Sequence, residues 1–196
     1  MHEPVQARYE FRAFAPNLET VAGRLAAESR PSELERFHDL YIVSRLTIDG
    51  NVKLRGDRLE VKELMAREGL FELWSPRLIA EMPIASDRFI DEVAPCLGLD
   101  MKRPRIDMLA ETDIVQLCAT MPALEALRVD KVRRQFTFAH GLGEHVKLEV
   151  LSRAFESVAI EAQDLDDAQR LAAASGLDQH LNNSYPAFLQ ELAFPP

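Results

Sequence analysis

The stretch NVKLRGDRLEVKEL, residues 51–64, says most about the fold of this chain. Apolar and ionic residues alternate along both of its halves, which places them on opposite faces of a β-strand. The apolar positions are Val52, Leu54, Leu59 and Val61, and the ionic positions are Lys53, Arg55, Glu60 and Lys62. Gly56-Asp57 separates the halves and is typical of a hairpin turn. The stretch therefore predicts two antiparallel strands with one apolar face and one ionic face.

The residues before this hairpin continue the same pattern. Residues 5–14, VQARYEFRAF, alternate with Arg8, Glu10 and Arg12 on one face, and a helix is predicted over 18–29 after Pro16. Residues 38–48 predict a further strand that ends at the turn Asp49-Gly50-Asn51.

The residues after the hairpin first change character and then return to alternation. Residues 65–129 are rich in proline and predict two helices, over 86–99 and 112–127. Strands follow over 131–140, 145–152 and 155–163, then a helix capped by Asp164 that ends at Gly176, and an amphipathic segment over 184–194. We expect an α+β fold in a single domain, residues 1–196, with two halves (about 1–64 and 130–196) joined by a helical middle segment (about 65–129).

Composition limits the kinds of protein this chain can be. The formal net charge of −9 argues against general nucleic-acid binding, which depends on neutralising phosphates. No run approaches the roughly 18 apolar residues that span a bilayer, and the first residues do not look like a signal peptide. Cys96 and Cys118 lack a CxxC spacing and fit buried thiols in a reducing compartment, so we expect a cytoplasmic protein that does not contact membranes.

The ionic strand face allows two interpretations. If it turns inward in a closed sheet, it forms a charged channel that suits a phosphate-rich anion and a divalent cation. If it turns outward, it is the solvent-facing side of an ordinary antiparallel sheet, as in a structural or interaction domain. Alternation separates the two faces but does not say which one faces water.

The order of these charged strands resembles the CYTH family, which includes class IV adenylate cyclases and thiamine triphosphatases and is also called triphosphate tunnel metalloenzymes. Arg8-x-Glu10-x-Arg12 is similar to the family's E-x-E-x-K strand, and VKLRGDRLEVKEL is similar to its paired basic strands. KVRRQF, HVKLEVLS and FESVAIEAQDLDDAQRLAAASGL resemble the second half of the family, and NNSYPAFLQEL resembles its S-Y ending. The resemblance implies an antiparallel β-barrel with flanking helices.

It also implies a site on the inner strand faces. Cationic side chains would bind a triphosphate or another short polyphosphate, and carboxylates would hold Mg²⁺ or Mn²⁺. The implied phosphate-binding residues are Arg8, Arg12, Lys53, Arg55, Lys62, Lys131, Arg133 and Lys147. The implied metal ligands are Glu10, Glu149 and Glu161.

Two departures from the family pattern leave the activity open. Arg8 and Ala159 stand where the family has carboxylates, so the resemblance implies one metal site and leaves a second one open, and Arg8 adds positive charge. A metal-dependent triphosphatase that hydrolyses the terminal phosphoanhydride and a non-catalytic anion-binding or sensing protein are both compatible with the sequence. The organic group on the phosphates and the oligomeric state are not determined by it.

Overall fold

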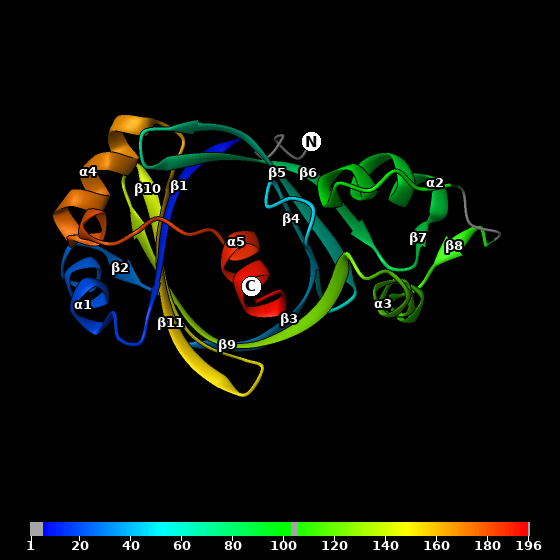
Figure 1. Cartoon of the computed structure of the whole chain (residues 1–196). Helices are drawn as coiled ribbons and strands as arrows, with labels where there is room; N and C mark the ends of the chain where they lie inside the picture. Colours follow the sequence, from blue (N-terminus) through cyan, green and yellow to red (C-terminus); the bar gives the residue numbers. More distant parts are fainter. Residues whose placement is uncertain (1–5, 103–105, 196) are drawn as a thin grey trace. The chain divides into compact units, whose positions relative to one another are not determined.

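A computed structural model describes residues 6–102 and 106–195, and it has the α+β class expected from the sequence. Nine strands form one sheet in the order β10-β11-β1-β6-β5-β4-β3-β9-β2, and β10 also pairs with β9 (Figure 1). This second pairing closes eight of the strands into an antiparallel β-barrel. The strands are β1 (Arg8–Ala15), β2 (Arg30–Pro31), β3 (Glu35–Ser44), β4 (Gly50–Arg55), β5 (Arg58–Glu68), β6 (Phe71–Glu81), β9 (Leu124–Phe138), β10 (Gly141–Val150) and β11 (Arg153–Ala162).

Helices flank the barrel, and a small second sheet pairs β7 (Ile84–Ala85) with β8 (Met108–Leu109). Short helical segments follow α2 and α4, and they are η1 (Phe89–Val93), η2 (Ala94–Leu97) and η3 (Leu177–Gln179). The α-helices in the described part of the chain are α1 (Glu19–Glu28), α2 (Ser86–Arg88), α3 (Glu111–Thr120), α4 (Leu165–Ser175) and α5 (Tyr185–Ala193).

The elements with the strongest local signals lie where the sequence predicted them. The hairpin pairs Val52 with Val61 and Lys53 with Glu60 across β4 and β5, and Gly56 has a φ of 59° in its turn. The Asp164 side chain accepts hydrogen bonds from the backbone N–H groups of the first turn of α4, and Gly176 ends this helix at a φ of 75°. The predicted first strand began at position 5, which lies outside the described residues.

The predicted helical middle segment, 65–129, differs from the structure in extent. Its two helical regions are present, but β5 continues to Glu68, β6 occupies 71–81 and β9 begins at Leu124. Pro76 lies within β6, and a proline inside a strand pattern argues against a strand at the level of sequence. Pro122 ends the second helical pattern early, so α3 stops at Thr120.

The chain divides into two compact units: unit 1 draws strands from both predicted halves, whereas unit 2 combines strands of the first half and the middle segment with helix α5 of the second half. Unit 1 comprises residues 1–37, 64–75 and 129–184, and unit 2 comprises residues 38–63, 76–128 and 185–196.

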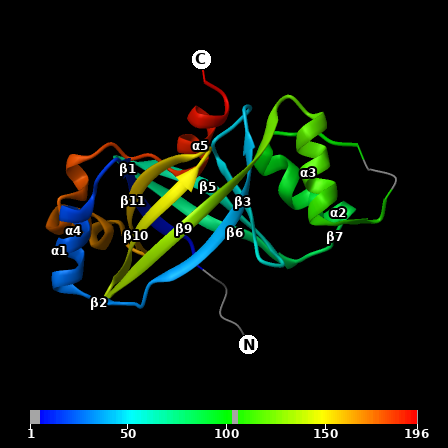
Figure 2. The same cartoon turned by 90° about the horizontal axis from the view of Figure 1, so that it is seen from below.

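Unit 1 places its apolar core between the strands and two helices. Phe11 and Ile160 are fully buried on one face of β1 and β11, and Leu25 of α1 and Ala172 of α4 pack against the same cluster. The two helices lie side by side in both views (Figure 1, Figure 2). Burying this face contributes about 25 cal/mol for each Å² of apolar surface removed from water.

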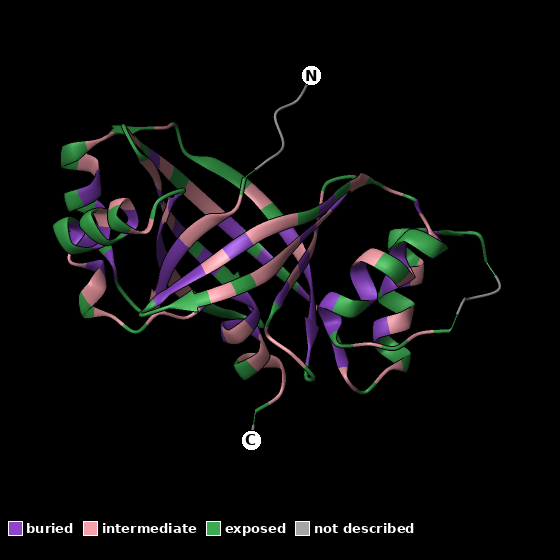
Figure 3. Cartoon of the chain, turned by 90° about the horizontal axis from the view of Figure 1, so that it is seen from above, coloured by how far each residue is buried: buried purple, intermediate pink, exposed green. Residues whose placement is uncertain are grey.

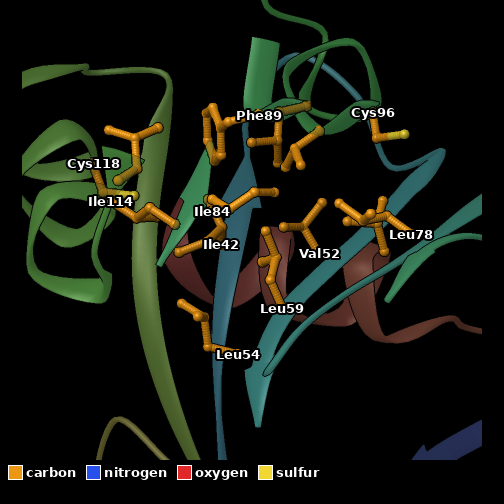
Figure 4. Close-up of a cluster of buried hydrophobic side chains, with 14 of the residues drawn as sticks. Ile42, Val52, Leu54, Leu59, Leu78, Ile84, Phe89, Cys96, Ile114 and Cys118 are labelled. Carbon is orange, nitrogen blue, oxygen red and sulfur yellow. The ribbon is translucent and has the colours of Figure 1, made fainter. Parts of the chain in front are cut away.

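Unit 2 has its own core, built in the same way. The apolar residues of the hairpin, including Val52 and Leu59, pack with Ile42 of β3 against Phe89 and Ile114 of the middle segment (Figure 4). Figure 3 shows the resulting alternation of buried and more exposed positions along the strands. Helices α1 and α4 in unit 1 and the helices of the middle segment in unit 2 therefore cover the apolar strand face, and we call the opposite, ionic face the inner face.

Helix α5 lies on the inner face of its own unit. The Tyr185 ring stacks on the Tyr41 ring at 5.2 Å between centroids, and Gln190 Nε2 donates to the Ser44 carbonyl at 2.7 Å. Tyr41 pairs in register with Lys53, so their side chains share a face. The C-terminal helix thus covers part of the strand face that carries Lys53.

Two glycines provide a matched test of this packing. A Cβ added at Gly50 would lie 1.9 Å from the backbone oxygen of Cys96, whereas a Cβ at Gly23 of α1 meets no atom within 4 Å. We expect Gly50→Ala to lower the free energy of unfolding by about 1–3 kcal/mol, because the added methyl group overpacks the contact with Cys96. Gly23→Ala is expected to raise it by roughly 0.5–1 kcal/mol, because alanine loses less backbone entropy in a helix. Urea denaturation measures both, and equal effects of the two variants would contradict the described contact.

Candidate functional site

The inner face of unit 1 carries a buried cluster of cations around one carboxylate. Arg12 Nη1 donates to Glu144 Oε1 at 3.1 Å, and Arg133 Nη1 donates to Glu144 Oε2 at 3.4 Å. Lys131 is on the same face, because Lys131 and Arg133 of β9 pair with Leu148 and Val146 of β10, which lie on the Glu144 side. Arg12 and Lys131 are each only 5% exposed.

The charge of this cluster controls the ionisation of Glu144. Burial alone raises the pKa of the Glu144 carboxyl, but the positive charges of Arg12, Lys131 and Arg133 outweigh it and hold the pKa at about 2. Glu144 is therefore a charged partner of three basic side chains at neutral pH, of which Arg12 also pairs with Glu10 and Arg133 with Glu35. Among the described residues, the buried Nε–H of Arg133 has no hydrogen-bond partner.

A row of three carboxylates lies beside this cluster. Glu10 of β1 pairs in register with Glu72 of β6 on one side and with Glu161 of β11 on the other. Burial raises the pKa of Glu72, and the nearby negative charge of Glu10 raises it further. A hydrogen bond that Trp74 Nε1 donates to Glu72 lowers the pKa, but it does not cancel the effect of burial. We call Glu72, Glu10 and Glu161 the carboxylate row.

Each carboxylate of the row has an arginine partner. Arg12 Nε donates to Glu10 Oε1 at 2.7 Å, Arg67 Nε lies 3.4 Å from Glu72 Oε1, and Arg8 Nη1 lies 3.6 Å from Glu161 Oε2. The negative charge of the row is thus matched by three guanidinium groups.

The inner face of unit 2 holds a second set of ionic residues. Arg55 donates from Nε and Nη2 to the two oxygens of Asp39, at 2.7 and 2.8 Å, and Asp39 is fully buried. Lys53 Nζ lies 3.2 Å from Glu60 Oε2, and burial lowers the pKa of Lys53, with a further contribution from the charge of Arg55. Lys62 follows Glu60 by two positions and shares this face.

Two of the predicted site residues lie elsewhere. Lys147 and Glu149 are exposed on the opposite face of β10, where Lys147 forms an ion pair with Glu19 of α1. The apolar residues of β10, Val146 and Leu148, are the ones on the inner face. The other predicted residues are on the inner faces: Arg8, Glu10, Arg12, Lys131, Arg133 and Glu161 in unit 1, and Lys53, Arg55 and Lys62 in unit 2.

Four acids of these faces were not among the predicted site residues, although alternation had placed Glu60 on the ionic face. Glu72 lies on the strand that the sequence did not predict, and Glu144 lies where a glycine turn was expected to precede the strand. Asp39 and Glu60 are in predicted strands, and their signal was the same alternation that identified Lys53 and Arg55. That Asp39 pairs with Arg55, and Glu60 with Lys53, follows only once the pairing of the strands is known.

The residues present do not fit the divalent cation that the resemblance implies. Glu149 is on the other face of the sheet and cannot join Glu10 and Glu161. The carboxylate row offers oxygen donors, which Mg²⁺ prefers, but each carboxylate already faces a guanidinium. In the described residues, no three histidine, cysteine or acidic side chains are grouped so that they could hold a metal ion.

Within the described ranges, none of the helices combines the length and apolar character that crossing a bilayer requires.

Comparisons with known proteins identify the fold. No family model matches the sequence. No curated protein matches it either. Solved structures do match: a conserved hypothetical protein of Pyrococcus furiosus has a TM-score of 0.53 at 12% identity, over 91% of this chain and 98% of that one.

Two further solved structures are similar over most of their length. A Hippeastrum protein described as a candidate adenylyl cyclase with a dominant triphosphatase activity has a TM-score of 0.52 at 10% identity, over 95% of this chain and 96% of that one. The protein PH1012 of Pyrococcus horikoshii OT3 has a TM-score of 0.51 at 14% identity, over 86% and 90%. At these identities the likeness is one of fold, and this chain shares its fold with these proteins.

Proposed function

We propose that this chain is a CYTH-like protein that binds a short polyphosphate anion, such as tripolyphosphate, through the cations of its inner faces. The observation that carries the proposal is the buried Nε–H of Arg133, which has no hydrogen-bond partner in the described part of the chain, while the Nη groups of the same guanidinium donate to Glu144 and Glu35. A buried donor without an acceptor is costly, and a phosphate oxygen is a suitable acceptor for an arginine.

The candidates for anion contact are the cations of each inner face, taken unit by unit: Arg8, Arg12, Lys131 and Arg133 in unit 1, and Lys53, Arg55 and Lys62 in unit 2. Most of these cations already face a carboxylate, such as Arg12 with Glu144 and Arg55 with Asp39, so a bound anion would compete with these acids for the same donors. The order of the charged strands resembles that of the CYTH family, and the fold likeness to the Hippeastrum triphosphatase supports the same class of ligand.

We assign binding and not hydrolysis to the inner faces. Hydrolysis of a phosphoanhydride requires groups that orient the attacking water and stabilise the transferred phosphoryl group. The carboxylates that could take part each face an arginine or lysine, and no step is assigned to Mg²⁺ or Mn²⁺. The alternative of a solvent-facing interaction domain predicts no anion affinity at all.

Isothermal titration with tripolyphosphate tests the proposal. We expect saturable binding, weakened about tenfold or more in Arg133→Gln, because the change removes a charge-assisted hydrogen bond. Lys53→Gln tests the inner face of unit 2 in the same way. Lys147→Gln is the matched control, since Lys147 is exposed on the other strand face, and it should bind like the unaltered protein.

Two outcomes would contradict the assignment. Equal loss of affinity in Lys147→Gln would mean that the anion binds by overall charge and not at the inner faces. Release of inorganic phosphate from tripolyphosphate, lost in Glu161→Ala, would replace binding by hydrolysis.

A further inference from the structure

The carboxylate row is a place where three acids sit side by side, and their charge must be balanced. Glu10 and Glu72 are 9% and 8% exposed, so solvent screens them poorly. Like charges directly opposite each other on paired strands are destabilising. Such a row needs either a bound cation or basic side chains.

Basic side chains supply the balance here, one for each acid. Arg12 and Arg67 compensate Glu10 and Glu72, and Arg12 also donates to Ser157 Oγ at 3.0 Å. A divalent cation on this row would add two positive charges to a site that already has three guanidinium groups. Those guanidinium groups would have to give up their carboxylates to admit the ion.

Arg8 and Arg67 are held less tightly than Arg12. Their side chains are 37% and 49% exposed and their contacts with Glu161 and Glu72 are 3.6 and 3.4 Å long, whereas the Arg12 side chain is 6% exposed and its contact with Glu10 is 2.7 Å long. Of the two exposed arginines, Arg8 lies on β1, on the same strand face as Arg12, so it can turn toward a ligand that Arg12 also contacts.

We propose that this chain binds its polyphosphate anion without a divalent cation, with the Arg8 guanidinium contacting the anion directly. The inference rests on the proposed function and specifies how the site works. An arginine presents a fixed pair of donors to phosphate oxygens and does not depend on a metal concentration.

Direct metal titration tests the inference without any anion. Mn²⁺ added to the full chain and followed by electron paramagnetic resonance should show no saturable binding below about millimolar concentration, where a site with dedicated carboxylates would be occupied. Saturable binding in that range, lost in Glu10→Gln, would overturn the inference.

Titration with tripolyphosphate gives the second test, in EDTA and in excess Mg²⁺. We expect the affinity in EDTA to equal or exceed that in Mg²⁺, because Mg²⁺ neutralises the free anion. Arg8→Gln should weaken binding about tenfold in EDTA, and Lys147→Gln should not. An affinity at least tenfold lower in EDTA than in Mg²⁺ would overturn the inference and leave the proposed function standing. Absence of binding in both conditions would overturn the proposed function and this inference with it.

A charge reversal adds a gain-of-function test. Arg8→Glu places a fourth carboxylate beside Glu161 and removes the guanidinium that balances it. We expect this variant to acquire saturable Mn²⁺ binding that the unaltered protein lacks. If circular dichroism shows that the variant is folded and it still binds no Mn²⁺, the guanidinium is not what keeps the metal out, and the inference fails.

Discussion

Arg55→Met is expected to lower the free energy of unfolding by about 3–5 kcal/mol, the usual cost of removing one partner of a buried ion pair. Asp39 is fully buried and receives two charge-assisted hydrogen bonds from Arg55, at 2.7 and 2.8 Å. Methionine keeps the apolar stem of the side chain and removes both donors, so the buried Asp39 carboxylate loses its two hydrogen bonds from Arg55. Urea denaturation at neutral pH measures the loss.

Two further variants are compared with Arg55→Met. Lys147→Met removes an ion pair whose lysine side chain is 55% exposed, and it should leave the unfolding midpoint unchanged. The double variant Arg55→Met/Asp39→Leu should recover part of the loss, because neither charge then remains buried. If Arg55→Met proves as stable as the unaltered protein, the bidentate pair does not hold β3 to β4.

Glu144→Gln is expected to have two opposite effects. At pH 7 it should lower the free energy of unfolding by up to about 3 kcal/mol, since the pKa of Glu144 is about 2 in the folded protein and its ordinary value is 4.5. It should also raise the affinity for tripolyphosphate about tenfold or more, because the anion no longer competes with Glu144 for Arg12, Lys131 and Arg133.

The pH dependence of the stability effect follows from the direction of the shift. A carboxyl with a lowered folded pKa contributes its stability in full above pH 4.5, and the contribution disappears as the pH falls toward 2. The difference between Glu144→Gln and the unaltered protein should therefore shrink between pH 5 and pH 2 in urea denaturation. Glu149→Gln, an exposed carboxylate on the same strand, is the control and should change neither stability nor anion affinity. A difference that stays constant with pH would show that Glu144 stabilises by packing and not by charge.

Much of the fold follows from short-range patterns. Alternation identified the hairpin of β4 and β5 and the two faces of β1, because successive side chains of a strand point to opposite sides whatever the rest of the chain does. Asp164 and Gly176 marked the ends of α4 for equally local reasons. The Asp164 side chain caps backbone N–H groups at the start of the helix, and Gly176 has the positive φ that ends it. Strand β6 was missed because Pro76 interrupts its pattern, and neighbouring strands decide whether such a segment pairs.

The sequence by itself determined which residues share a face on each strand, and so which cations could act together. Only the tertiary structure decided which face is covered by helices, and it placed Lys147 and Glu149 on the helix side and Val146 and Leu148 on the inner side. It also decided the partners, such as Glu144 with Arg12 or Asp39 with Arg55, which are 132 and 16 positions apart in the chain. The physical reason is that alternation has a period of two and no direction: the side of a strand that is buried depends on what packs against it, and that is a property of the whole fold.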